Sequence, residues 1–353
     1  MAIQTAIDSI NNSSGSPFGF KNRIINGAMV IAQRGTAAVT TNGAFPVDRW
    51  VQFMSGGGVI TGIQDSDVPS SAFQYSTKLT ATTADASIAA ADFYAFNQNI
   101  EGFNAADLGF GTATANTVTL SFWVKSSITG TYAVALYNSA GTRGYPATYT
   151  ISAANTWTFI SLTIPGDTGG TWLKDNGTGI TIRYDLGTGS NGNGTANTWN
   201  TSGTFAASRT SSTVNWISTL NATFFITGVQ LEKGSTATSF DYRPYGTELA
   251  LCQRYYEEIW CMWATVWSAG MNNFPNGTYK VNKRAVPTTV VYADATPLAK
   301  TGATGSVYNQ TNSANITGAN VNNEGTSNFN IDYNTGSASA RNMRASVTSS
   351  AEL

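Results

Sequence analysis

The stretch ITGVQLEKGSTATSFDYRPYGTELALCQRYYE, from Ile226 to Glu257, decides how the chain is divided. Its first six residues alternate between two faces, which is the period expected of a β-strand. Pro244 then fixes its own φ angle, lacks an N–H donor and disfavours the α conformation at Arg243. The stretch therefore closes a strand and continues as an extended segment toward a new element.

A helix is predicted directly after this segment. Thr247 can cap its N-terminus, and Glu248 suits the positive end of the helix dipole. Apolar residues then recur at steps of three, four and three, the spacing of one helical face; they are Leu249, Cys252, Tyr256 and Ile259. We therefore predict a helix over residues 247–258 and a domain boundary between residues 245 and 246.

The composition favours a β-rich globular protein. Of 353 residues, 41% are apolar and only 11% are charged, which leaves enough apolar material for two domain cores. The net charge of −1 argues against nucleic-acid binding and against electrostatic docking on anionic membranes. The chain has no histidine, so Ser-His-Asp and Cys-His nucleophile systems and His-ligated metal sites are excluded.

The ends of the chain and its thiols give further expectations. Cys252 and Cys261 could form a disulfide, but free cysteine behaves as a small apolar residue, which favours two buried thiols. Residues 1–4 do not begin a signal peptide and no apolar run reaches 18 residues, so we expect folding in a bacterial cytoplasm. Ile3, Ile7 and Ile10 mark one face of a short N-terminal helix. Residues 1–17 are predicted to be an attachment peg, or else a frayed terminus.

Residues 18–245 are predicted to form an antiparallel β-sandwich, because segments of period-two alternation are separated by turn clusters. The predicted strands are Ile24–Ile31, Trp50–Met54, Ala72–Thr80, Tyr94–Ile100, Thr117–Lys125, Thr131–Asn138, Thr156–Ile164, Gly179–Tyr184 and Thr223–Leu231. Residues 246–353 combine the predicted helix with further strand patterns, which indicates a small α+β domain.

Several short sequence motifs resemble those of one protein family. NRIINGAMVIAQRG (22–35), FPVDRW (45–50), VQLEKG (229–234) and YRPYGTELALCQRYYE (242–257) are similar to the jelly-roll module of tail-fibre and other virion proteins of tailed bacteriophages. The resemblance implies a jelly roll like that of carbohydrate-binding modules. It also implies a place in the virion, a homotrimeric assembly and attachment to other tail or virion proteins through the N-terminus.

Candidate glycan-binding residues lie on the predicted outer strand faces. The alternation places Trp123 and Lys125 opposite the apolar row of their strand, and it does the same for Tyr137 and Arg183. If all four share one sheet surface, their rings and donors suit stacking on sugars and hydroxyl recognition. The alternative is a subunit interface or a covering loop over the same surface.

Oxygen ligands for a structural calcium ion are also present. Jelly rolls of this kind often hold such an ion, and Asp48, Glu232 and Asp241 are the eligible carboxylates. The alternative is that these groups bond to turn amides or to basic neighbours. The sequence predicts no other cofactor.

A trimer interface is predicted from the narrow apolar stripes and the tryptophans that follow the second one. The candidate residues are Ile3, Ile7, Ile10, Leu249, Cys252, Tyr256, Trp260 and Trp263. The alternative is that the second stripe covers its own domain.

The predicted function is host-surface glycan adhesion without catalysis, because no spacing of carboxylates indicates an acid/base pair across a sugar ring. The alternatives are a purely structural fibre, capsid-decoration or tail subunit, a glycan depolymerase tailspike, and a free carbohydrate-binding module.

Overall fold

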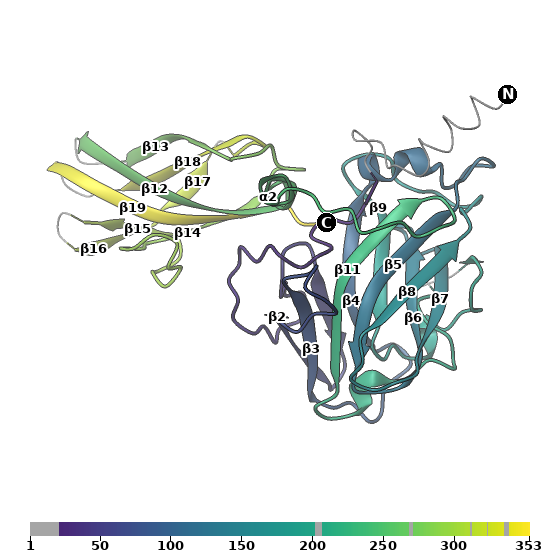
Figure 1. The fold of residues 1–353 in the computed structure, drawn as a ribbon. Coiled ribbons are helices and arrows are strands. Elements are labelled where there is room, and N and C mark those ends of the chain that lie inside the picture. Colours follow the sequence, from purple (N-terminus) through teal and green to yellow (C-terminus); the bar gives the residue numbers. More distant parts are fainter. Residues whose placement is uncertain (1–20, 202–206, 268–270, 311–312, 323, 335–338) are drawn as a thin grey trace. The chain divides into compact units, whose positions relative to one another are not determined.

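The computed structural model describes residues 21–201, 207–267, 271–310, 313–322, 324–334 and 339–353 (Figure 1). The chain forms two compact units, Met1–Arg243 and Pro244–Leu353. Each unit is described by itself. The sequence places the boundary between residues 245 and 246, two residues further along.

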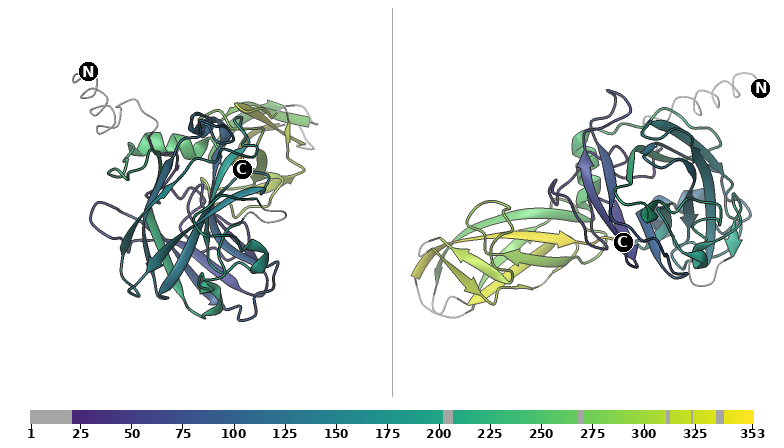
Figure 2. Two further views of the ribbon diagram at one scale, coloured as in Figure 1. Left: turned by 90° about the vertical axis from the view of Figure 1, so that its right-hand side faces the viewer. Right: turned by 90° about the horizontal axis from the view of Figure 1, so that it is seen from below.

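The first unit is a sandwich of two antiparallel sheets (Figures 1 and 2). The six-stranded sheet has the order β1 (Val51–Ser55), β4 (Phe93–Glu101), β9 (Thr178–Asp185), β6 (Gly130–Tyr137), β7 (Arg143–Ile151) and β10 (Asn200–Thr201). The five-stranded sheet has the order β2 (Val59–Asp65), β3 (Ser76–Thr83), β11 (Thr223–Lys233), β5 (Val118–Ser126) and β8 (Thr158–Ile164). Short 3-10 helices connect them: η1 (Gly102–Asn104), η2 (Ala106–Leu108), η3 (Ser190–Gly192) and η4 (Trp216–Ser218). The predicted antiparallel jelly roll is confirmed.

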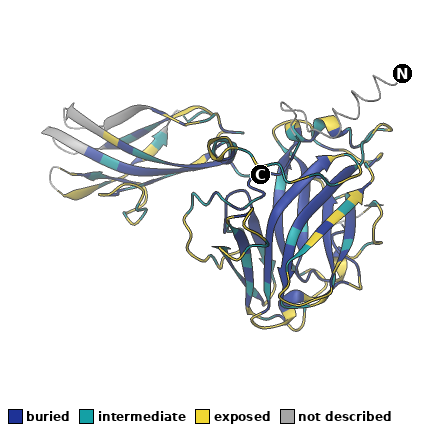
Figure 3. Cartoon of the chain, viewed as in Figure 1, coloured by how far each residue is buried: buried dark blue, intermediate teal, exposed yellow. Residues whose placement is uncertain are grey.

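The core lies between the two sheets, because successive side chains of a strand point to opposite faces. On β5, Leu120, Phe122 and Val124 are fully buried, whereas the outward Trp123 is half-buried. The edge strand β8 alternates exposed residues with buried or half-buried ones (Figure 3). The strand pattern of the sequence therefore predicts the inward rows correctly.

One predicted strand of this unit is wrong. Residues 24–31 form a buried loop, in which Asn26 and Met29 have positive φ angles of 58° and 60°. The Asn26 side chain donates hydrogen bonds of 2.9 Å to the carbonyl oxygens of Ile31 and Asp48. The Asn26 carbonyl accepts the indole N–H of the fully buried Trp50 at 3.0 Å. These bonds satisfy the loop's buried polar groups without a strand ladder.

The second unit contains one helix among its described residues, α2 (Tyr245–Gln253). One sheet has the order β12 (Tyr256–Trp267), β19 (Ser339–Ser350), β15 (Ser306–Asn309) and β16 (Ala314–Thr317), and β14 (Thr288–Tyr292) also pairs with β19. The other sheet has the order β13 (Met271–Thr278), β18 (Asn328–Asn334) and β17 (Asn320–Asn322). The core of the second unit includes Val307, Phe329, Ile331 and Val347.

The predicted extent of the helix is wrong at both ends. The helix begins at Tyr245 after Pro244, so Thr247 is not its cap, and it ends at Gln253. Tyr256 and Ile259 lie on β12 instead. Residues 255–263 include four aromatic residues and the β-branched Ile259, types that favour a strand over a helix. The four residues therefore do not form one helical face.

The interface candidates are placed as follows. Cys252 and Tyr256 are buried, and Leu249 and Trp260 are half-buried. Ile3, Ile7 and Ile10 and the side chain of Trp263 lie outside the described part of the structure.

Cys252 and Cys261 are both buried and form no disulfide, which confirms the prediction of two buried thiols. In the part of the chain that the structure covers, no helix is long and apolar enough to cross a membrane.

Candidate ligand-binding cleft

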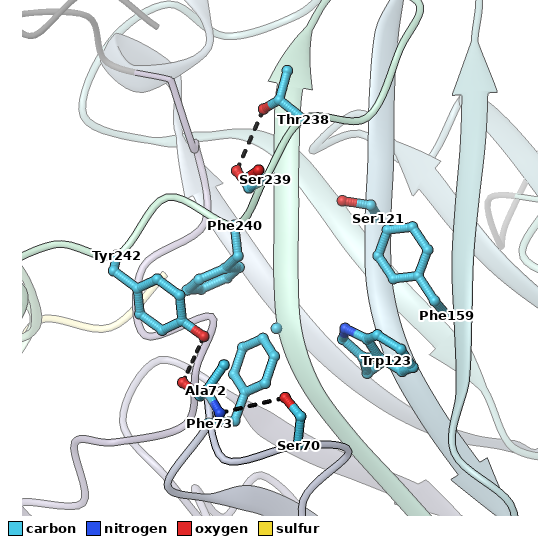
Figure 4. A pocket seen from close by; sticks show the side chains of 11 residues that line it. Ser70, Ala72, Phe73, Ser121, Trp123, Phe159, Thr238, Ser239, Phe240 and Tyr242 are labelled. Atoms are coloured by element: carbon cyan, nitrogen blue, oxygen red, sulfur yellow. Dashed lines mark hydrogen bonds between the residues drawn. The ribbon is translucent and has the colours of Figure 1, made fainter. Parts of the chain in front are cut away.

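A cleft with a volume of about 350 Å³ lies on the outer face of the five-stranded sheet (Figure 4). Its floor is strand β11 at Gly228, and β5 and β8 form one side of it. Two loop segments, residues 70–73 and 238–242, form the other side. The lining residues are Ser70, Ala72, Phe73, Ser121, Trp123, Phe159, Gly228, Thr238, Ser239, Phe240 and Tyr242.

A β-bulge shapes the floor of the cleft. The pairing of β11 with β5 shifts register between Thr227 and Gln230. At Gly228, φ is +62°, a conformation that side-chain-bearing residues rarely adopt. A Cβ atom at Gly228 would lie 2.7 Å from Phe73 Cζ and 3.2 Å from Trp123 Cδ1. Because Gly228 has no side chain, the space above the strand stays open between the aromatic rings on its two sides.

Aromatic rings flank this floor, as Figure 4 shows. On one side, the ring centroid of Phe240 lies 5.4 Å from that of Phe73 and 4.7 Å from that of Tyr242. On the other side, the centroids of Trp123 and Phe159 are 5.3 Å apart. Phe159 is 46% exposed and Tyr242 is 53% exposed. Large rings that stay exposed around a concavity indicate a binding surface rather than a core.

The loop that carries Phe240 and Tyr242 is held by outward polar groups of β11. Glu232 Oε1 accepts the backbone N–H of Thr238 at 2.9 Å, and Glu232 Oε2 accepts its hydroxyl at 2.7 Å. Gln230 Oε1 accepts the backbone N–H of Asp241 at 2.8 Å. These bonds fix the loop in place, because each of them joins it to the rigid sheet.

The loop that carries Phe73 is held in the same way. Thr227 Oγ1 donates to the carbonyl oxygen of Tyr75 at 2.7 Å. The Asp67 carboxylate forms an ion pair with Lys125 and accepts the indole N–H of Trp157 at 2.9 Å. Burial acts to raise the pKa of Asp67, but the hydrogen bonds from Lys125 and Trp157 outweigh it, so the pKa is lowered. The loops that flank the cleft are therefore held in place without a ligand.

The lining is uncharged. Its polar side-chain groups are the indole N–H of Trp123 and the hydroxyls of Ser70, Ser121, Thr238, Ser239 and Tyr242. Flat rings can stack on apolar faces of a ligand, and hydroxyls can both donate and accept hydrogen bonds. The arrangement suits a neutral ligand that is rich in hydroxyl groups.

Only one of the four predicted glycan-binding residues, Trp123, lines this cleft. Lys125 lies next to it on the same face, but it is paired with Asp67, and its Nζ atom lies 4.1 Å from the Phe225 ring centroid. Tyr137 and Arg183 belong to β6 and β9 of the other sheet, whose outer face points away from this one. The prediction that all four share one surface is therefore wrong.

Residues that sequence reasoning missed come mainly from the loops. Phe240 and Tyr242 follow no strand period, and Phe73, which belongs to the predicted strand Ala72–Thr80, lies in the loop before β3. Gly228 was the available signal, because a glycine inside a strand pattern indicates a bulge or a close approach.

Two of the three calcium candidates, Glu232 and Asp48, use their carboxylates within the protein. Both oxygens of Glu232 bind Thr238. Asp48 Oδ1 accepts the backbone N–H of Gln33 at 3.0 Å and lies 3.6 Å from Arg34 Nη1. Across the described residues, no three His, Cys, Asp or Glu side chains gather as a metal site would require.

No protein-family model matches the chain, and no curated protein matches it. Among solved structures, the enzymatically active domain of tailspike protein 4 of bacteriophage CBA120 is similar at 17% identity and a TM-score of 0.33. This match covers 60% of the present chain and 21% of the tailspike chain.

Two carbohydrate-binding modules are similar as well. The family 11 module of a cellulosomal cellulase of Clostridium thermocellum matches at 11% identity and a TM-score of 0.28, over 57% of this chain and 98% of the module. A xylan-binding domain from Paenibacillus barcinonensis matches at 12% identity and a TM-score of 0.26, over 57% and 99%. Similarity at these values carries no argument about function, which has to come from the site itself.

Proposed function

We propose that the protein is a non-catalytic adhesion subunit of a tailed-phage virion, and that the cleft on its five-stranded sheet binds a host-surface glycan. One observation supports the glycan part: exposed rings stand on both sides of an uncharged cleft whose lining offers hydroxyl groups. A pyranose ring has apolar C–H faces and equatorial hydroxyls, which match these two kinds of contact.

The virion part rests on the sequence motifs that resemble phage tail-fibre proteins. Several residues of these motifs hold the first unit together. Asn22 donates to the carbonyl oxygen of Val229 at 3.2 Å, and Arg243 donates to that of Ile24 at 2.9 Å. The two ends of the unit are thus tied to each other. These contacts concern the architecture of the module, and the last motif also supplies one cleft residue, Tyr242.

A homotrimer is part of the same proposal. Cys252 and Tyr256 are already buried in the monomer, so they offer little surface to a partner. Leu249 and Trp260 are half-buried and remain candidates, together with the peg at residues 1–17. Light scattering should show a trimer for the wild type and a smaller species for Leu249→Asp, because an unpaired charge in an interface is strongly unfavourable. A monomeric wild type would contradict this part.

The glycan part is tested by binding of the purified protein to host-surface polysaccharide. Trp123→Ala should weaken binding at least tenfold, which corresponds to ~1.4 kcal/mol. Phe103→Ala is the matched control, since Phe103 is 62% exposed on η1 and does not line the cleft.

Equal binding by both variants would mean that the cleft is not the site. Failure of the wild type to bind any host glycan would favour a purely structural subunit. Steady release of reducing ends from the polysaccharide would instead indicate a depolymerase.

A further inference from the structure

Strand β5 carries two polar side chains into the cleft, those of Ser121 and Trp123. The two residues occupy alternate positions of the strand, so both side chains project from its outer face. Ser121 lies directly opposite Gln230 on β11 and Ser161 on β8. In Figure 4 the hydroxyl of Ser121 and the indole nitrogen of Trp123 are both turned toward the floor at β11. A ligand on this floor would therefore meet both groups.

Neither group is used within the protein. The Ser121 hydroxyl and the Trp123 indole N–H have no hydrogen-bond partner among the described residues. The polar neighbour of Ser121 on β11 is engaged elsewhere, because Gln230 accepts from Asp241 at 2.8 Å and donates to Glu232 at 2.9 Å. Ser121 is nevertheless only 3% exposed. A buried hydroxyl that has no protein partner and opens onto a cleft indicates a place for a ligand group.

The two groups are both unused and reachable, which sets them apart from other polar groups of the sandwich. Ser208 Oγ and Trp216 Nε1 also lack partners in the described ranges, but both atoms are closed off from solvent. Within the cleft, the hydroxyl protons of Thr238 and Tyr242 are already donated to other groups of the protein. The two remaining lining serines are exposed, so water can satisfy them. Polar selection of a ligand therefore falls to strand β5.

These two groups define what the ligand has to offer. An indole N–H can only donate a hydrogen bond, whereas a serine hydroxyl can donate or accept one. The acetamido group of a sugar has a carbonyl oxygen for the first and an amide N–H for the second, and it ends in a methyl group. Phe159 beside Trp123 and Phe240 on the opposite loop offer apolar surface for this methyl group. A ring hydroxyl would match the polar groups but would bring no apolar part to these rings, and a carboxylate would find no charged side chain among the described lining residues.

We propose that Ser121 and Trp123 make the cleft selective for a sugar that carries an acetamido group. The indole N–H donates to the carbonyl oxygen, the Ser121 hydroxyl accepts the amide N–H, and the methyl group packs against the aromatic rings. This inference rests on the proposed function, because it concerns the glycan that the same cleft binds. The ligand is neutral, in keeping with the uncharged lining.

Matched sugars test this selectivity with the full chain. The probes are the methyl β-glycosides of N-acetylglucosamine and N-acetylgalactosamine, each compared with the methyl β-glycoside of its parent hexose. Saturation-transfer NMR detects weak binding and also reports which ligand protons lie closest to the protein. We expect an acetamido sugar to bind about fivefold more tightly than its parent hexose, the effect of one net hydrogen bond. The strongest saturation should fall on the acetamido methyl group.

Three variants separate the contacts, with melting temperatures to show that each is folded. Ser121→Ala should abolish most of the preference for the acetamido sugar, whereas Ser161→Ala should keep it. Ser161 is the matched control, because it lies opposite Ser121 on β8, is exposed and does not line the cleft. Trp123→Phe keeps an aromatic ring but removes the indole N–H, so it should lose the preference while still binding both sugars weakly.

Failure of this inference and failure of the proposed function give different results. A wild type that prefers neither acetamido sugar would overturn the inference, and so would a folded Ser121→Ala protein with the preference of the wild type. If that wild type still binds host-surface polysaccharide, the proposed function stands. If it binds neither the sugars nor the polysaccharide, both proposals are wrong. Loss of the preference in Ser161→Ala as well would mean that the strand surface, and not the Ser121 hydroxyl, selects the ligand.

Discussion

The hydroxyl of Tyr242 donates a hydrogen bond of 2.6 Å to the carbonyl oxygen of Ala72, which lies 170 residues earlier in the chain. This bond joins the two loops that flank the cleft. Tyr242→Phe removes it while keeping the ring and its contact with Phe240. We expect three- to tenfold weaker glycan binding and a loss of about 0.5–1.5 kcal/mol in the free energy of unfolding. Calorimetry and urea titration measure the two quantities, and unchanged affinity would show that the loops are held without this bond.

Gly228 is expected to control access to the floor of the cleft. Gly228→Ala introduces a Cβ close to Phe73 and Trp123 and also strains a positive φ angle, which costs about 1–2 kcal/mol. Gly43→Ala is the control, because Gly43 has a φ of +78° with open space around it. Both variants should lose stability, but only Gly228→Ala should lose glycan affinity. Equal effects on affinity would mean that strain alone acts.

We expect the contribution of Asp67 to stability to be lost at acidic pH. Its pKa is lowered in the folded protein, so the charged form stabilises the fold. This contribution is complete above the ordinary value of 3.8 and is lost as the pH falls through the lower folded-state pKa. The melting temperatures of wild type and Asp67→Asn should therefore differ at pH 6 and should begin to converge only as the pH falls below 3.8. A constant difference across this range would exclude the carboxylate as its cause.

A fully buried ion pair supports the second unit. Lys283 Nζ lies 3.0 Å from Glu257 Oε1, neither side chain is exposed, and Lys283 also donates to the carbonyl oxygen of Gln253 at 2.6 Å. Burial lowers the pKa of Lys283, and Glu257 opposes this shift. Glu257→Gln leaves a buried ammonium without its counter-ion, so we expect a loss of about 3–5 kcal/mol. Chemical denaturation measures it. The double variant Glu257→Gln with Lys283→Met should recover part of the loss, and the absence of recovery would contradict the pairing argument.

The thiol of Cys261 is expected to be inert in the native protein. Burial raises its pKa to about 12, so almost no thiolate is present at pH 8. Cys252 is fully buried as well. A thiol reagent at pH 8 should label neither residue within an hour, and it should label both in denaturant. Labelling of Cys261 under native conditions would show that β12 opens locally.

The sequence by itself determined which residues face the core. Alternation along a strand depends only on backbone geometry, so Leu120, Phe122 and Val124 could be assigned to the interior without knowledge of their neighbours. The boundary near Pro244 could also be predicted from nearby residues alone, because proline restricts its own φ angle and the conformation of the residue before it. The unit boundary lies within two residues of the predicted one.

Only the tertiary structure decided which outward residues meet. Trp123 and Arg183 obey the same alternation, but their strands joined different sheets, and no local pattern encodes that choice. The same holds for the cleft, since its loops at residues 70–73 and 238–242 come together through Tyr242 and Ala72. Residues 254–258 became a turn and a strand for a related reason, because pairing with β19 outweighed the helical spacing. Strand partners and loop contacts depend on residues far away in the chain, which is why periodicity predicts faces but not sites.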